Sequence, residues 1–218
     1  MPVQLFLVPL AAPPHVVADL SAVLDPDERL RAASFRRTIL ADRYLVAHGT
    51  LRLALGACLG TAAESLRFVR APRGKPSVDE SVRFNISHSG DLMLLGMTRD
   101  QEIGVDIEQV TELDVADLLP NRDRAAVAAL PPACRRRAAL QAWTRMEARS
   151  KASGAGLADG PPVNDEDGFT TCDLEVDDQY VASVSVQGGG PDLVCTRFDS
   201  SEAASDFFRK TAKGVDAR

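Results

Sequence analysis

Cysteine is scarce in this chain of 218 residues, and Cys58, Cys134, Cys172 and Cys195 are spread too widely to form a C-x-x-C pair. This spacing excludes a structural zinc site and a disulfide framework, and it favours reduced thiols in a cytoplasmic protein. Long apolar runs are also missing, so no membrane-spanning segment is expected. The N-terminus lacks the charged start of a signal peptide, and residues 3–8 are instead predicted to form a first strand.

Lysine is nearly as rare, with four lysines against 21 arginines. The chain therefore uses arginine at most positions where a basic residue is needed. Two lysines lie outside the C-terminal tail, and these, Lys75 and Lys151, are noteworthy because arginine would be the default. The net charge of −6 argues against a general nucleic-acid binder. Arginines crowd residues 29–52, which makes that region a candidate anion site. The acidic residues between 159 and 178 indicate a solvated surface.

The stretch from residue 82 to 110 is the most informative part of the chain. It predicts short strands at residues 84–86, 92–97 and 103–107, with a break in the chain at residues 87–91. On an extended strand Asp106 and Glu108 share one face, while the residues between and before them face a core. Two carboxylates about 7 Å apart repel each other unless a cation or proton lies between them.

A hard divalent cation suits such a pair, since Mg²⁺ binds one or two protein carboxylates together with substrate phosphates. A D-x-E pair alone is more often a solvated strand face. Here Ser87, His88 and Ser89 lie upstream in what the sequence predicts to be a small-residue turn able to approach an anion.

Two helices are predicted in the N-terminal region. Asp25 is placed to cap the first, with Pro26 and Glu28 at its first and third positions. The second is expected over residues 37–59. Arg36, Arg43 and Arg52 border its apolar stripe, and flanking arginines of this kind are usually solvent-facing.

Later segments contribute a further pair of charged residues. A helix is predicted over residues 135–157, ended by glycines, and it places Glu147 and Lys151 four residues apart on one face. On a surface such a pair stabilises a helix by only about 0.2–0.5 kcal/mol, whereas beside a metal and a phosphate it offers a third carboxylate and a cation. Residues 180–186 and 193–198 are predicted to pair as strands across three glycines. The tail after Ser200 is expected to be loose.

The chain contains four motifs in order: Gly74-Lys75-Pro76, Phe84-Asn85-Ile86-Ser87-His88-Ser89, Gly104-Val105-Asp106-Ile107-Glu108, and Trp143-Thr144 through Glu147 to Lys151 and Gly154. In this order and spacing they resemble the motifs of the 4′-phosphopantetheinyl transferases, in the pseudodimeric class typified by the surfactin-synthetase activating enzyme. The resemblance covers roughly residues 29–156. Met146 departs from the pattern, because the family usually has lysine there.

The resemblance implies an α+β protein of two similar halves, residues 1–109 and 110–218, with coenzyme A in the cleft between them. The implied reaction is transfer of the phosphopantetheine arm to a serine of an apo acyl or peptidyl carrier protein, as in polyketide or nonribosomal peptide biosynthesis. A monomer without nucleic-acid or membrane partners is expected.

The resemblance also implies a role for each site residue. Asp106, Glu108 and Glu147 would hold Mg²⁺, and Glu147 is the candidate base. Lys151 and His88 would contact phosphate oxygens as catalytic groups. The other coenzyme A contacts would come from Arg36, Arg43, Lys75, Pro76 and Ser87.

Two other functions are compatible with some of these residues. One is a coenzyme A- or carrier-binding module without catalytic activity, against which the retained carboxylates and Lys151 argue. The other is a metal-dependent phosphohydrolase using Asp106 and Glu108, which would not need the Lys75 loop or the N-terminal arginines.

Overall fold

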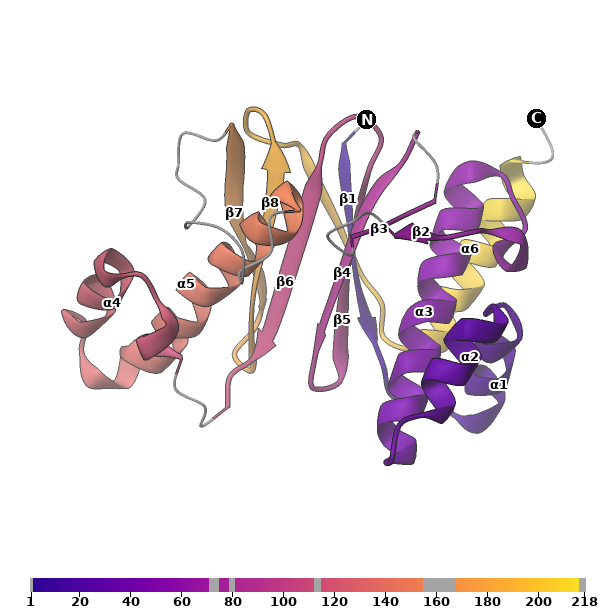
Figure 1. Ribbon diagram of the computed structural model, residues 1–218, viewed down its shortest axis with the longest axis horizontal. Coiled ribbons are helices and arrows are strands. Elements are labelled where there is room, and N and C mark those ends of the chain that lie inside the picture. The colour runs from indigo at the N-terminus through magenta and orange to yellow at the C-terminus, as the bar shows by residue number, and fades with distance from the viewer. Residues whose placement is uncertain (1, 71–74, 79–80, 112–114, 155–167, 216–218) are drawn as a thin grey trace. The chain divides into compact units, whose positions relative to one another are not determined.

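The computed structural model describes residues 2–70, 75–78, 81–111, 115–154 and 168–215. The chain is a mixed α+β protein, which confirms the predicted class (Figure 1). It divides into two compact units: unit 1 comprises Met1–Leu5, Arg70–Gly90 and Leu94–Cys195, and unit 2 comprises Phe6–Val69, Asp91–Met93 and Thr196–Arg218. These bounds differ from a division at Gln109, and the two similar halves stay a prediction.

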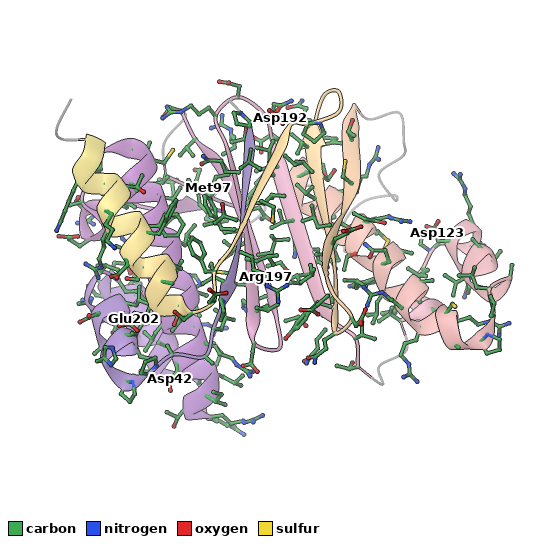
Figure 2. All side chains as sticks on the ribbon, turned by 180° about the vertical axis from the view of Figure 1, so that it is seen from behind. Asp42, Met97, Asp123, Asp192, Arg197 and Glu202 are labelled. Carbon is green, nitrogen blue, oxygen red and sulfur yellow. The ribbon has the colours of Figure 1, made fainter. Side chains whose placement is uncertain are left out.

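Unit 1 contains a three-stranded antiparallel sheet covered by a helix. The sheet has the order β6-β8-β7, with β6 at Ile103–Gln109, β8 at Tyr180–Gln187 and β7 at Phe169–Asp177. The long helix α5 (Pro132–Ser153) packs on β6 and β8 (Figure 1). Before it come a short 3₁₀ turn at Ala116–Leu118 and helix α4 (Asn121–Ala128), which carries Asp123 (Figure 2).

The remaining strands form two further sheets among the described residues. A four-stranded sheet has the order β4-β5-β1-β9, with β4 at Arg83–Ser89, β5 at Leu92–Thr98, β1 at Val3–Pro9 and β9 at Leu193–Arg197. Two short strands, β2 (Val69–Arg70) and β3 (Pro76–Ser77), pair with each other. The strands predicted at the start of the chain and at 92–97 are confirmed.

Unit 2 is mainly helical. Its long helix α3 (Thr38–Leu59) contacts α1 (Pro14–Ala22), α2 (Pro26–Ala33) and α6 (Ser201–Val215). A short 3₁₀ turn at Ala63–Ser65 follows α3. The predicted start of α2 is confirmed, since the Asp25 carboxylate accepts from the Glu28 amide and the Glu28 carboxylate from the Asp25 amide, at 2.9 and 3.0 Å.

The prediction that residues 180–186 and 193–198 pair with each other is wrong. β8 lies between β6 and β7, whereas β9 lies beside β1 in a different sheet. Nearly all of β8 is buried, as expected for a central strand with partners on both sides. Its second partner, β7, forms in part of the stretch predicted to be only a solvated acidic surface.

The prediction of a loose tail after Ser200 is also wrong, because most of it forms α6. Phe208 is 3% exposed, and its ring lies 5.1 Å from that of Phe6 and 5.9 Å from that of Phe198. At the first turn, Glu202 lies 3.4 Å from His15 of α1 (Figure 2). Burial of this aromatic cluster stabilises a helix whose sequence is otherwise polar.

Arg52, predicted to flank the α3 stripe toward solvent, is fully buried. Its guanidinium donates to the Glu28 and Asp25 carboxylates at 2.6 and 2.7 Å, and to two carbonyls after α3 at 3.0 and 3.1 Å. The guanidinium also lies over the ring of Phe68, with its central carbon atom Cζ 4.9 Å from the ring centroid. Arg52 therefore joins the start of α2 to α3 and to the segment that follows α3.

Replacing Arg52 by alanine is expected to lower the free energy of unfolding by about 3–5 kcal/mol, because it removes the cation from two half-buried carboxylates and the donor from two carbonyl groups, and leaves a cavity in place of a fully buried side chain. The exposed Arg36 provides the control, and Arg36→Ala is expected to change the free energy of unfolding by less than about 0.5 kcal/mol. Urea unfolding measures both. A loss below about 1 kcal/mol for Arg52→Ala would contradict the structural role.

Glu28 gives this cluster a defined pH dependence. Burial acts to raise the pKa of Glu28, but hydrogen bonds with His48, the Asp25 amide and Arg52 outweigh it and lower the pKa below 4.5. A lowered folded-state pKa stabilises the protein above the unfolded value, and this contribution is lost as pH falls through the folded value. Wild type should therefore have a higher free energy of unfolding than Glu28→Gln. This difference should be largest at neutral pH and should decrease below pH 4.5. Urea unfolding across this range measures it, and a pH-independent gap would refute the ionic contribution.

Candidate active site

The paired carboxylates lie on β6 as predicted. Asp106 and Glu108 share one side of the strand, while Val105 and Ile107 are fully buried on the other. Asp106 is itself only 2% exposed, and Glu108 is half-buried. The D-x-E pair is therefore not a solvated strand face.

The predicted break at residues 87–91 begins later than expected. Ser87, His88 and Ser89 are the last residues of β4, and the chain turns at Gly90, which has φ 56°. A side chain at Gly90 would collide with Gln109, 2.5 Å from the Cβ position. In the strand Ser87 and Ser89 point to one side and His88 to the other, where it is exposed.

Helix α5 brings the second charged pair to β6. Gly104 permits close packing, since a Cβ there would lie 2.0 Å from the Ala148 carbonyl oxygen and 2.3 Å from the Ala152 amide nitrogen. Buried Thr144 links the helix to the sheet through the Ser183 hydroxyl at 3.0 Å. The helix ends with Gly154 in the left-handed conformation, as the sequence predicted, whereas Gly156 lies outside the described residues.

Lys151 lies against the buried carboxylate. Its ammonium donates to Asp106 Oδ1 at 2.6 Å and to the Ser87 hydroxyl at 3.1 Å. The Ser87 hydroxyl in turn donates to the same carboxylate oxygen at 2.8 Å. Lys151 and Ser87 are thus brought together with Asp106, while the roles predicted for them in binding coenzyme A and Mg²⁺ stay predictions.

The three carboxylates influence one another electrostatically. Burial raises the pKa of Asp106, against the lowering effect of Lys151. Burial also raises the pKa of Glu108, against the Ser89 hydrogen bond, and the Asp106 charge adds to the rise. Burial raises the pKa of Glu147 too, with Lys151 opposing and both other carboxylates contributing. The cluster has more negative charge than Lys151 neutralises.

The donor set fits a hard divalent cation. Asp106 Oδ2 is buried without a hydrogen-bond partner, and carboxylate oxygens are the protein ligands that Mg²⁺ prefers. Within the described ranges, no three His, Cys, Asp or Glu side chains are already close enough to form a metal site. Closing the cluster around an ion would therefore require the carboxylate side chains to move closer together.

The Lys75 segment is attached to the same part of unit 1. Lys75 donates to Glu102 at 2.6 Å and to the carbonyl oxygens of Ile103 and Ala152 at 3.2 and 3.4 Å. Glu102 also accepts from Arg83 at 2.8 Å. Pro76 begins β3, and Gly74 lies outside the described residues. Phosphate contacts of Lys75 and Pro76 stay predictions.

Arg36 and Arg43 belong to unit 2. Arg36 is exposed between α2 and α3, and Arg43 of α3 donates to the Asp91 carboxylate. Their predicted contact with coenzyme A is untested, as is that of His88. Met146 is half-buried on α5 next to Glu147.

Two polar residues of β4 were missed as site residues. Ser89 donates to Glu108 Oε2 at 2.7 Å, and the Asn85 side-chain oxygen accepts from the Val105 amide at 2.9 Å. Both lie in the motif at residues 84–89, and the polar spacing at every second residue from 85 to 89 marks one face of a strand. Predicting a turn at 87–91 concealed that pattern.

Known proteins with similar sequences identify the class. The family model described as the 4′-phosphopantetheinyl transferase superfamily matches residues 102–207. The 4′-phosphopantetheinyl transferase HetI of a Nostoc species is 29% identical over 86% of this chain and 89% of its own length. A Synechocystis protein, slr0495, provisionally named as such a transferase, is 30% identical over 72% of this chain and 67% of its own. The transferase psf-1 of Bacillus pumilus is 30% identical over 66% and 64%.

The chain belongs to the 4′-phosphopantetheinyl transferase superfamily and is a transferase. The matched region contains β6 and α5, and therefore Asp106, Glu108, Glu147 and Lys151. Among the described helices, none is both long and apolar enough to cross a membrane.

Proposed function

We propose that the protein transfers the 4′-phosphopantetheine arm of coenzyme A to a serine hydroxyl of an apo acyl or peptidyl carrier protein, with Mg²⁺, releasing 3′,5′-ADP. The observation that carries the proposal is the cluster of three mutually interacting carboxylates with Lys151, in a chain of this family. A cluster of this charge suits a diphosphate held through a divalent cation.

In the transfer the serine oxygen forms a bond to the β-phosphorus while the bond from that phosphorus to the bridging oxygen breaks. Asp106, Glu108 and Glu147 would hold Mg²⁺, which supplies charge stabilisation to the diphosphate when bound. Lys151 stabilises the charge that develops on the leaving oxygen. The serine proton passes to Glu147, because this carboxylate would contact both the metal and the incoming hydroxyl.

The donor-binding residues are proposed by analogy with the family. Lys75, Pro76, Ser87 and His88 bind the phosphates and the adenine end of coenzyme A, with Arg36 and Arg43 contributing from the N-terminal region. His88 also acts with Lys151 on phosphate oxygens. The fold proposed is a pseudodimer of residues 1–109 and 110–218 with coenzyme A between the halves. We also propose a cytoplasmic monomer that serves polyketide or nonribosomal peptide carriers.

One assay separates the proposal from its alternatives. The protein is incubated with labelled coenzyme A, Mg²⁺ and a panel of apo carrier proteins, and the products are identified by mass spectrometry. If the protein is a transferase of this kind, a carrier protein should gain the mass of one phosphopantetheine group for each serine that is modified. Release of pantetheine phosphate without a carrier would indicate a phosphohydrolase. Coenzyme A binding without any product would indicate a non-catalytic module.

A further inference from the structure

The strand that carries the two carboxylates has an edge without a backbone partner in its own sheet. β6 pairs with β8 on one side and is the edge strand of the three-stranded sheet. β4 contacts β6 but belongs to a different sheet, and Figure 1 shows the two strands near each other. Buried amides at such an edge need acceptors from elsewhere.

Side chains of β4 supply these acceptors at regular spacing. The Val105 amide donates to the Asn85 side-chain oxygen at 2.9 Å, and the Gln109 amide donates to the Ser89 hydroxyl at 3.0 Å. Both pairs have the same offset in sequence, so β4 follows β6 in the same direction with one fixed register. Between them, Ser87 reaches the Asp106 carboxylate at 2.8 Å.

The contacts of Ser89 fix the direction of its hydroxyl proton. A backbone amide can only donate, so the Ser89 oxygen accepts from Gln109, and its single proton points to Glu108 Oε2 at 2.7 Å. Ser87 is similar, since it accepts from Lys151 and donates to Asp106. The donor to Ser87 is a flexible side chain, whereas the donor to Ser89 is backbone and cannot turn away.

We propose that Ser89 is a positioning residue, which holds the Glu108 carboxylate by one oxygen so that the other is presented for cation binding. This inference rests on the proposed cation site and assigns Ser89 no contact with substrate. Groups that hydrogen-bond to metal ligands in this way typically contribute about 10- to 100-fold to metal affinity.

Alanine and threonine at position 89 separate positioning from general stability. Ser89→Ala leaves the Gln109 amide without its acceptor and frees the Glu108 side chain. Ser89→Thr keeps the hydroxyl and suits a strand position. The control is Thr171→Val, which removes a comparable hydroxyl bond, 3.0 Å to Ser185, in the β7–β8 pair.

The test is Mn²⁺ binding to the full chain, with and without coenzyme A, followed by electron paramagnetic resonance. We expect Ser89→Ala to raise the Mn²⁺ dissociation constant about tenfold or more, while Ser89→Thr and Thr171→Val stay within about threefold of wild type. Equal Mn²⁺ affinity for wild type and Ser89→Ala would overturn the role of Ser89 and leave the cation site intact. Absence of Mn²⁺ binding by wild type in both conditions would overturn the cation site and, with it, this role.

Hydrogen exchange gives a readout that does not depend on a metal. In wild type the Gln109 amide should exchange slowly, because it is bonded to Ser89. Ser89→Ala should accelerate exchange at Gln109 more than at Asp106 or Ile107, and Ser89→Thr should restore protection. Unchanged exchange at Gln109 in Ser89→Ala would contradict the contact on which the proposal rests.

Discussion

Replacing Glu147 by glutamine is expected to lower the rate of phosphopantetheine transfer by at least about 10³-fold, since it removes both a proposed metal ligand and the proposed base. The change keeps the shape of the side chain, so α5 should pack on β6 as before. Glu175→Gln, at an exposed position of β7, is the matched control and should transfer normally. Near-normal turnover of Glu147→Gln in saturating Mg²⁺ would reject both roles.

The same variant should be more stable than wild type when no divalent ion is present. Burial and the two neighbouring carboxylates raise the pKa of Glu147 above 4.5. A folded-state pKa above the unfolded one makes stability fall as pH rises between the two values. Glu147→Gln cannot ionise and so avoids this loss of stability. Its thermal unfolding midpoint should be higher than that of wild type at neutral pH and equal to it below pH 4.5. Lost activity with lost stability would instead indicate misfolding.

Gly104→Ala is expected to lower the free energy of unfolding by about 3 kcal/mol or more and to reduce transfer with it. The new Cβ would lie 2.0 Å from a backbone oxygen and 2.3 Å from a backbone nitrogen of α5. Backbone atoms of a helix cannot rotate aside as a side chain can, so this end of the helix must move away from β6. Because α5 carries Glu147 and Lys151, this movement would separate them from Asp106.

Gly189→Ala provides the control for Gly104→Ala. A Cβ at Gly189 would meet nothing within 4 Å, so this variant should unfold and transfer like wild type. Urea unfolding and the transfer rate measure both substitutions. A stable Gly104→Ala protein with unchanged transfer would contradict the close packing of α5 on β6.

The parts of the fold that sequence could predict depend on local patterns. Alternation on β6 placed Asp106 and Glu108 on one face, and the capping box at Asp25 fixed the start of α2. Helical spacing put Glu147 and Lys151 on one side of α5. Each of these patterns involves residues within four positions of one another, where strand and helix geometry decide the outcome.

The parts that sequence could not predict depend on contacts between distant residues. Whether β8 pairs with β9 or with β6 is decided by which sheet buries each strand, and the α6 helix depends on packing against Phe6, which is far away in the chain. The burial of Arg52 required partners from two other segments. In the site, the Ser89–Glu108 and Lys151–Asp106 contacts join residues 19 and 45 positions apart.

The most direct test of the account is the Mg²⁺ dependence of phosphopantetheine transfer by the wild-type protein, with the 3′,5′-ADP released and the modified carrier measured in the same reaction. The account predicts equal amounts of the two products, loss of both when Mg²⁺ is chelated, and recovery when Mg²⁺ is restored. Undiminished transfer in the presence of a chelator would contradict the proposed cation site of Asp106, Glu108 and Glu147.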